Sequence, residues 1–413
     1  MSSPTTAAPL TVRTATTAEH EAFLRTRRSA SFLQTPAWAS VKSEWRSESL
    51  LWERDGATVG AALVLYRQLP KVKRYLAYLP EGPVLDWAAD DLASWLDPMV
   101  RHLKRRGAFA VRMGPPVITG RWSAAQVKAG IADESVRRLT ELPPTERSVE
   151  GARAVSQLNA LGWRHLVAEG GFAAGQPQYN FVIPLRVSTS STTGDNPTPG
   201  DNPPTGDSPT PGDSPTSGDS RPRSADEVLK GMNQLWRRNI KKAEKSGVVV
   251  TVGGADDLAA FHRLYVHTAE RDHFTPRPLS YFQTMYAALN GAGDLSELRL
   301  YLAHHEGDLV ASTLWIRVGG HAWYSYGASS TEKREVRGSN AVQWRMIVDA
   351  LEAGADVYDL RGITDTLDAD DAHVGLIQFK VGTGGEAVEY AGEWDLPINR
   401  ALYKAFTLYM ERR

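Results

Sequence analysis

Lys380 lies next to a run of glycines in the stretch QFKVGTGGE (378–386), close to the end of the chain. A lysine among glycines is typical of phosphate-binding loops, where backbone N–H groups and an ammonium group face one anion. A dinucleotide-binding loop would also require a helix directly after the glycines. The segment that follows, EAVEYAGEWDLPI, instead alternates like a strand. We therefore expect Gly382, Gly384 and Gly385 to form a turn that lets another stretch of chain approach the backbone, which leaves the lysine as the chemically informative residue.

A strongly basic run, LWRRNIKKAEK (235–245), is a second candidate for anion binding. On a helix, four of its cations share one face, and these are Arg238, Lys241, Lys242 and Lys245. Like charges spaced in this way repel by about a few tenths of a kcal/mol per pair. A polyphosphate partner would relieve that repulsion, and a solvated helix face is the alternative interpretation.

Two tyrosines in the stretch HAWYSYG (321–327) form a third candidate site. Strict strand alternation predicts Tyr324 and Tyr326 on one face and Trp323 on the other. The tyrosines either belong to the core or line a groove for a peptide or a sugar, because their rings are apolar and their tips polar.

Other catalytic signatures are missing from the sequence. It contains no GxSxG elbow, no HExxH zinc motif and no GxxxxGK[ST] phosphate loop. The chain has no cysteine, which excludes disulfides, thiolate zinc sites and a cysteine nucleophile. Its formal net charge of −1 gives no global attraction for nucleic acid, so a polyanion would have to be held by local clusters. We expect no metal and no resident cofactor.

Two parts of the chain repeat the same order of predicted helices and strands. This order predicts the fold that holds the candidate residues in place. Each part shows a helix, an antiparallel meander with an acidic-Gly turn, a second helix and a short apolar strand. The matched ranges are 36–45, 50–85 and 99–114 in the first part, and 256–271, 300–330 and 347–362 in the second. This order is that of the GNAT-type acyltransferase fold. We therefore predict an α+β (mixed α/β) protein with two tandem GNAT-like domains.

The predicted domains span 1–170 and 171–392, and a C-terminal helix over about 393–413 is expected to pack back on the first domain. In a GNAT domain that uses CoA, small residues begin the helix after the meander and expose backbone N–H groups to the pyrophosphate. The corresponding stretch, EKREVRGSNAVQW, has Glu335 and Asn340 at motif positions. A carboxylate would repel a pyrophosphate, so we predict an acyl donor other than CoA.

A hexapeptide repeat of the type GDNPTP interrupts the second domain. It contains Pro, Gly, Asp, Ser and Thr without an apolar anchor, so we predict a disordered insertion over 187–222. The segment after it (224–247) is predicted to be one helix, with Ser224 as N-cap, Glu227 as its capping-box partner and Gly247 as C-cap.

Several motifs, in order along the chain, resemble those of the Fem-type (FemABX) peptidyltransferases. They are FLQTPAWASVKSEW, YLPEGPVLDW, LKGMNQLWRRNIKKAEKSGV, AWYSYGASS and GLIQFKVGTGGE. The resemblance covers nearly the whole chain outside the repeat and the N-terminal tail. It implies a tandem GNAT-like protein that uses aminoacyl-tRNA to add an amino acid to the stem peptide of a peptidoglycan precursor, either lipid II or UDP-MurNAc-pentapeptide.

The resemblance also implies roles for residues on the acceptor side. Lys42, after the motif Q-x-P-x-W, is implied to hold the diphosphate of the precursor. Arg238, with Arg237 beside it, is implied to do the same. Asp86 matches a residue of the acceptor groove.

On the donor side, Phe379 and Lys380 match the Phe-Lys pair of the family, where the lysine lies near the transferred ester. Tyr324 and Tyr326 match groove tyrosines. An ester is already activated, so positioning can supply much of the rate. We expect Lys380 to offer positive charge to the oxyanion or to the leaving 3′-oxygen more than to act as a base.

Two departures from the family pattern matter. Gly114 in VRMGPP occupies a position that is acidic in many relatives, so a general base is missing there. No heptad run provides the coiled-coil arm of some members, so the chain resembles the compact ones.

The expected protein is a cytoplasmic monomer, either free or in peripheral contact with the inner face of the cell membrane. Its composition is that of a high-GC bacterium, which favours glycine as the transferred residue. Two alternatives stay open: a tRNA-dependent aminoacyltransferase of peptide antibiotic biosynthesis or resistance, and a non-catalytic module that binds a phosphorylated glycan or RNA.

Overall fold

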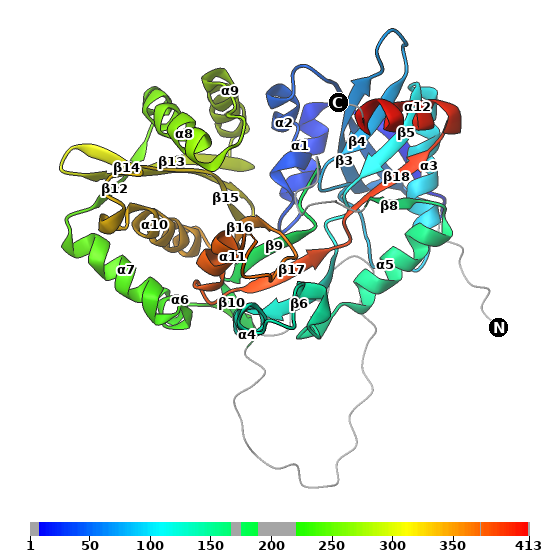
Figure 1. The fold of residues 1–413 in the computed structure, drawn as a ribbon. Helices are drawn as coiled ribbons and strands as arrows, with labels where there is room; N and C mark the ends of the chain where they lie inside the picture. The colour runs from blue at the N-terminus through cyan, green and yellow to red at the C-terminus, as the bar shows by residue number, and fades with distance from the viewer. Residues whose placement is uncertain (1–7, 167–174, 189–219, 372, 412–413) are drawn as a thin grey trace, which may run out of the picture.

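Two mixed β-sheets with helices on both faces organise the chain (Figure 1). The computed structural model describes residues 8–166, 175–188, 220–371 and 373–411. The first sheet has seven strands. In spatial order they are β1 (Thr11–Ala15), β2 (Arg46–Arg54), β3 (Ala57–Gln68), β4 (Tyr75–Leu79), β5 (Ala108–Met113), β18 (Glu393–Pro397) and β8 (Arg164–Leu166).

The second sheet has nine strands and carries most of the candidate site. In spatial order they are β12 (Val249–Gly253), β13 (Ser296–His305), β14 (Asp308–Val318), β15 (His321–Ser329), β16 (Val357–Ile363), β9 (Tyr179–Pro184), β17 (Glu386–Tyr390), β6 (Ile118–Ser123) and β7 (Glu146–Arg147). The long apolar runs of β3 and β14 occupy central places and are buried on both faces.

The two sheets repeat one plan, which confirms the predicted tandem arrangement. β2, β3 and β4, then α3 (Leu92–Arg105) and β5 in the first half, correspond to β13, β14 and β15, then α10 (Gly338–Glu352) and β16 in the second. In both halves the last meander strand pairs in parallel with the strand after the helix. The halves also exchange strands, because β6 pairs with β17 in the second sheet and β18 pairs with β5 in the first.

Helices cover both faces of each sheet. The other α-helices are α1 (Thr17–Arg25), α2 (Ala37–Val41), α4 (Ala124–Ala132), α5 (Val149–Ala160), α6 (Ala225–Gly231), α7 (Gln234–Lys245), α8 (Leu258–Asp272), α9 (Leu279–Asn290), α11 (Val374–Val381) and α12 (Arg400–Glu411). Short 3-10 helices are η1 (Phe32–Gln34), η2 (Leu139–Glu141), η3 (Ala255–Asp257) and η4 (Arg334–Val336).

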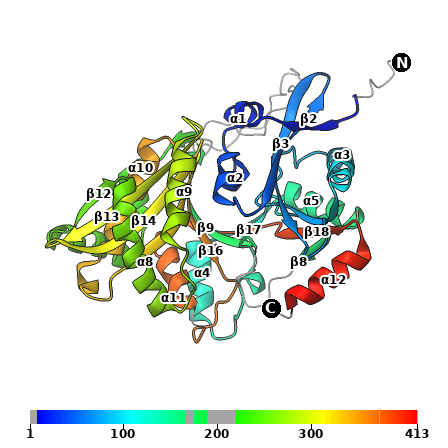
Figure 2. The ribbon, with the colours of Figure 1, turned by 90° about the horizontal axis from the view of Figure 1, so that it is seen from above.

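One apolar core joins the two halves. Side chains of α1, η1 and α2 in the first half pack with those of α8, α9 and strands β13 to β15 in the second. The ring of Phe32 lies 5.2 Å from Trp38 on its own side and 5.2 Å from Trp323 across the junction. Figure 2 shows α2 beside α9 where the halves meet. An apolar junction of this kind favours one fixed arrangement of the halves.

Two predicted helices differ from those observed. The segment 224–247 is not one helix, because Asn233 caps a new helix by accepting from the N–H of Trp236, and α6 and α7 are therefore separate. The capping box of Ser224 and Glu227 is confirmed, and Gly247 follows α7 with a φ of +78°. The helix expected over 36–45 ends at Val41.

The repeat insertion lies mostly outside the described residues, which omit 189–219. The expectation of disorder was wrong for its two ends, where β10 (Arg186–Ser188) and β11 (Ser220–Pro222) pair as an antiparallel ladder. At the end of the chain, α12 packs on the first sheet through Tyr403 and Phe406. The helix expected over about 393–413 was wrong at its start, because residues 393–397 form strand β18.

Candidate functional site

Lys380 lies in the last turn of α11, with its side chain inside the protein. Only 3% of the residue is exposed. Its Nζ donates to the carbonyl oxygens of Gly362 (2.6 Å) and Arg361 (3.2 Å) at the end of β16. Burial lowers the pKa of Lys380 to about 7, Asp359 opposes this shift, and the Arg361 guanidinium adds to it. At neutral pH the lysine can therefore both hold and release a proton.

The glycines after Lys380 form the expected turn. A Cβ atom at Gly384 would overlap the carbonyl oxygen of Gly231, and one at Gly385 would overlap that of Val182. A Cβ at Gly382 would overlap the ring of Trp236. The glycines thus let α6, α7 and β9 reach the backbone beside Lys380, and the predicted close approach is confirmed.

A pocket of about 410 Å³ opens in front of Phe379, the neighbour of Lys380. It lies where α7, the start of α10 and α11 meet, and Trp236 and Phe379 form one wall with ring centres 4.8 Å apart. The indole N–H of Trp236 donates to the carbonyl of Phe379 (2.8 Å), which fixes that wall. Arg334 and Arg337 also line the pocket and add positive charge, and so does Lys333, which is paired with Glu306 and Asp308.

β15 and β16 separate soon after they begin to pair. They pair only from His321 to Trp323, whereas β4 and β5 of the first sheet pair over five residues each. Beyond Trp323, Ser329 at the end of β15 and Ser330 directly after it line the pocket. The first residues of α10, Gly338 to Asn340, also line it, and the N-terminus of a helix of this length attracts anions.

Lys42 lies on the other face of the second sheet. Beside it lies Arg277, a cation that belongs to none of the sequence motifs. The Nζ of Lys42 is 5.3 Å from the ring centre of Tyr281, and the Arg277 guanidinium is 5.4 Å from the same ring. Burial lowers the pKa of Lys42, the charge of Arg277 lowers it further, and Glu44 opposes both. Two cations that share one tyrosine ring, and that form no ion pair in the described chain, make this a candidate anion site.

Tyr326 belongs to this anion site and Tyr324 does not. The Tyr326 hydroxyl lies 3.2 Å from that of Tyr281, and its ring packs in the core of the junction. Tyr324 packs on the opposite face, in the core under α10 and α11. The expectation that both share a face was wrong, because a β-bulge between Leu314 and Trp315 shifts the register of β15 by one residue.

The other predicted acceptor residues lie elsewhere. Arg237 donates to the carbonyls of Lys230 (2.9 Å) and Met232 (2.7 Å), where it caps α6. Arg238 is exposed on α7, and the second sheet lies between α7 and the side that carries α9 and Lys42. Asp86 is exposed in the loop between β4 and α3, where its carboxylate accepts from the N–H of Ala88.

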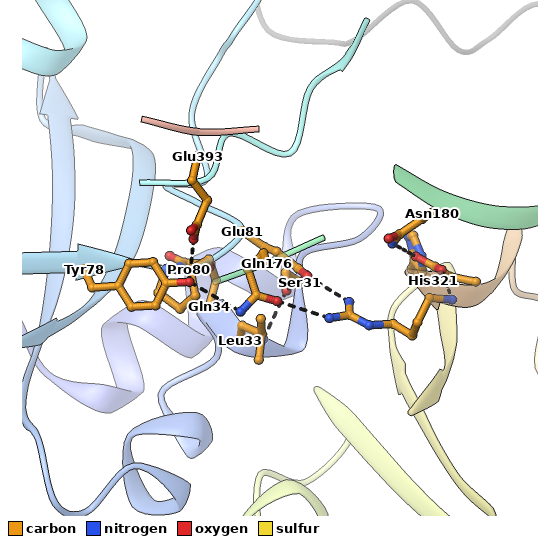
Figure 3. Close-up of polar contacts among 12 residues, drawn as sticks. Ser31, Leu33, Gln34, Tyr78, Pro80, Glu81, Gln176, Asn180, His321 and Glu393 are labelled. Carbon is orange, nitrogen blue, oxygen red and sulfur yellow. Dashed lines mark hydrogen bonds and ion pairs between the residues drawn. The ribbon is translucent and has the colours of Figure 1, made fainter. Parts of the chain in front are cut away.

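An inter-half ion pair connects the region of Lys380 to the first half. The Arg361 guanidinium donates to Glu81 (2.8 Å) and to Gln176 (3.2 Å). Glu81 also accepts from the hydroxyl of Ser31 (2.6 Å), which precedes η1. Figure 3 shows this chain of contacts continuing from Gln176 to Tyr78, whose hydroxyl donates to Glu393. The first half is therefore connected to Lys380 through Arg361.

The backbone at Arg361 is held in an uncommon conformation. Its φ is +63°, a value that non-glycine residues adopt only when their surroundings fix it. The N–H of Arg361 donates to Asp359 (2.6 Å), a buried carboxylate that also accepts from Asn180 (3.0 Å). These contacts determine where the two carbonyls that hold Lys380 point.

Gly114, at the position where an acid was expected, faces another carboxylate. A Cβ atom at Gly114 would lie 3.6 Å from Cγ of Glu393. Burial raises the pKa of Glu393, and the hydroxyl of Tyr78 donates to it at 2.6 Å. In the described ranges, no three His, Asp or Glu side chains lie close enough to hold a metal ion.

Comparisons with known proteins agree with this architecture. The lipid II:glycine glycyltransferases of Staphylococcus aureus strains USA300 and MRSA252 are each 24% identical over 457 aligned positions, which cover 94% of this chain and 93% of theirs. The crystal structure of FemX superposes with a TM-score of 0.73 at 23% identity, covering 95% of this chain and 99% of FemX. The FemAB family model matches residues 15–194, 218–298 and 295–411. The chain therefore belongs to the FemAB family.

Proposed function

We propose that this protein transfers an amino acid, with glycine favoured, from an aminoacyl-tRNA to the stem-peptide amine of a lipid-linked peptidoglycan precursor. The name of the Staphylococcus aureus relatives supports both the glycyl group and the lipid-linked acceptor. The observation that carries the proposal is that strand β15 takes part in both candidate sites. This strand contributes Ser329 to the pocket on one face of the sheet and Tyr326 to the anion site on the other.

The anion site suits the acceptor. A lipid-linked or UDP-linked precursor carries a diphosphate, and the two cations over Tyr281 offer it charge without a competing ion pair in the described chain. A diphosphate here would also relieve the repulsion between Lys42 and Arg277, which already lowers the pKa of Lys42.

The pocket suits the charged end of a tRNA. Phe379, which is partly exposed and packs against the buried Trp236, offers aromatic surface on which a terminal base can stack. The start of α10, with Arg334 and Arg337, can face the terminal phosphates. Outside the pocket, the cations of α7 are exposed along the path that an acceptor stem would take, and they are Arg238, Lys241, Lys242 and Lys245. We propose aminoacyl-tRNA as the only co-substrate, with no CoA and no metal.

The reaction is the aminolysis of an ester. The stem amine attacks the aminoacyl carbonyl, a C–N bond forms, the C–O bond to the tRNA 3′-oxygen breaks, and the amine proton ends on that oxygen. Lys380 would stabilise the oxyanion or the leaving oxygen with its ammonium group. A pKa near 7 also lets it pass a proton to the leaving oxygen and regain one from the attacking amine.

Incubation with a lipid-linked precursor and a panel of charged tRNAs, followed by mass analysis of the precursor, tests the proposal. We expect the precursor to gain one glycyl residue with glycyl-tRNA. Binding of charged tRNA without any mass gain would support the binding-module alternative. A gain only with a peptide unrelated to peptidoglycan would support the antibiotic pathway.

A further inference from the structure

The loop between β3 and β4 is a concentrated basic surface. From Tyr66 to Leu76 the chain contains four cations and no acid, and the cations are Arg67, Lys71, Lys73 and Arg74. Residues 70–74 are all exposed, and in the described chain the three cations of this loop tip form no ion pair. Backbone bonds from Leu69 to Arg74 (2.9 Å) and from Arg74 to Val72 (2.8 Å) hold the loop in a tight turn.

Exposed apolar side chains accompany these charges. Val72, at the loop tip, is 45% exposed. Leu69, at the base of the loop, packs in the same cluster as α12, and on α12 Leu408 and Tyr409 are 44% and 43% exposed. Lys404 is exposed on the same helix. Cations interspersed with exposed apolar groups are typical of surfaces that lie on anionic lipid.

This surface adjoins the anion site that we assign to the acceptor diphosphate. The Arg67 guanidinium lies 5.9 Å from the ring of Trp45, and the backbone N–H of Trp45 donates to the carbonyl of Lys42 (2.9 Å). Figure 1 shows the β3–β4 loop, α12, α2 and α9 along one side of the molecule. A lipid-linked diphosphate is held at the height of the membrane headgroups, so the enzyme must bring Lys42 close to that level.

We propose that the β3–β4 loop and the exposed side of α12 dock the protein on an anionic membrane surface. The proposal rests on the proposed function, because it explains how a chain whose described helices lack the length and apolar composition for a bilayer crossing reaches a lipid-linked acceptor. RNA is the other polyanion that cations could bind. Val72, Leu408 and Tyr409 favour lipid, because RNA phosphates offer no apolar phase for them.

Vesicle co-sedimentation of the full chain, without tRNA or acceptor, tests docking alone. We expect wild type to bind phosphatidylglycerol-containing vesicles at low salt and to bind pure phosphatidylcholine far more weakly. The variant Lys71→Gln/Lys73→Gln/Arg74→Gln should bind the anionic vesicles roughly a hundredfold more weakly. The matched control Lys241→Gln/Lys242→Gln/Lys245→Gln removes three charges from α7 and should bind them like wild type.

Turnover assays separate docking from catalysis. The loop variant should lose activity on lipid-linked precursor in anionic vesicles and keep it on the soluble UDP-linked precursor. No retention of wild type on anionic vesicles, or equal losses of vesicle binding in the two triple variants, would overturn the docking proposal. A loop variant that loses binding to uncharged tRNA instead of vesicles would identify an RNA surface and also overturn it. Absence of transfer to either precursor by wild type would count against the proposed function and leave the vesicle result to stand by itself.

Discussion

The Arg361 guanidinium lies 2.8 Å from the Glu81 carboxylate, across the junction of the two halves, while the backbone carbonyl of Arg361 accepts from Lys380. One residue thus takes part in the inter-half contact and in the cradle of the candidate catalytic lysine. Both side chains are only 19% exposed, so their ion pair is screened less than a surface pair.

Replacing Glu81 tests this connection. Glu81→Gln leaves Arg361 without its carboxylate and should let the carbonyls that hold Lys380 shift. We expect kcat to fall by about tenfold or more, the KM for the acceptor to change less, and the pH profile of kcat to move, since the surroundings of Lys380 change.

Another inter-half ion pair provides a matched control. Arg28 contacts Asp356 across the same junction, at 2.5 Å, without contact to the Lys380 cradle. Arg28→Gln should leave kcat and its pH profile unchanged. Equal effects of Glu81→Gln and Arg28→Gln would mean that the Glu81 pair only docks the two halves.

The cation pair over Tyr281 predicts a binding defect. Arg277→Met should raise the KM for a diphosphate-bearing acceptor by about tenfold and leave kcat nearly unchanged, because the lost contact is made equally in the ground state and in the transition state. Arg263→Met, on the exposed side of α8, should have no effect. An unchanged KM for the acceptor in Arg277→Met would show that this cation pair does not bind the diphosphate.

Lys380 predicts how stability depends on pH. Its pKa of about 7 in the folded protein is below the ordinary value of 10.5, so between these values the unfolded chain binds more protons. Wild type should therefore lose stability as the pH falls through this window, and the cost is fully present below pH 7. In urea unfolding, the free energy of unfolding of Lys380→Met should exceed that of wild type by about 1 kcal/mol or more at pH 6, and by less at pH 10. An equal difference at both pH values would contradict a lowered pKa.

The glycine turn predicts a stability difference between two glycines that both have a positive φ. Gly384 has a φ of +74° and faces the Gly231 carbonyl, whereas Gly307, with a φ of +88°, faces open space. Gly307→Ala should cost about 1 kcal/mol, and Gly384→Ala should cost at least about 2 kcal/mol more because the chain behind it must move. Urea unfolding measures both, and equal costs would show that the turn can relax.

Much of the fold was predictable because its signals are local. The apolar runs with acidic-Gly turns gave both meanders, the pattern of Ser224 and Glu227 gave a helix start, and the segment after Lys380 was recognisable as a strand. The strand exchange was not predictable, because β6 and β17 are about 265 residues apart and only their pairing in space shows which sheet each joins.

The site was predictable where a residue stands in a motif and not where it depends on register or on a distant partner. Phe379 lies in the wall of the pocket, and the ammonium group of Lys380, the next residue, donates to the carbonyl of Gly362. The bulge that separates Tyr324 from Tyr326 leaves no mark in the alternation of HAWYSYG. Arg277 and Glu81 acquire their roles from a tyrosine ring and a guanidinium contributed by other elements. In the sequence Arg277 is a single arginine between two prolines, and that pattern does not indicate that it contacts a tyrosine ring.

Transfer of glycine by wild type and by Lys380→Met tests the central claim most directly. Both proteins would be incubated with glycyl-tRNA and lipid-linked precursor, and the mass of the precursor would be followed over time by mass spectrometry. Precursor binding would be measured separately. The account predicts a glycyl mass gain with wild type, a rate reduced by more than about tenfold with Lys380→Met, and nearly equal precursor binding by the two proteins. Wild-type rates in Lys380→Met would contradict it.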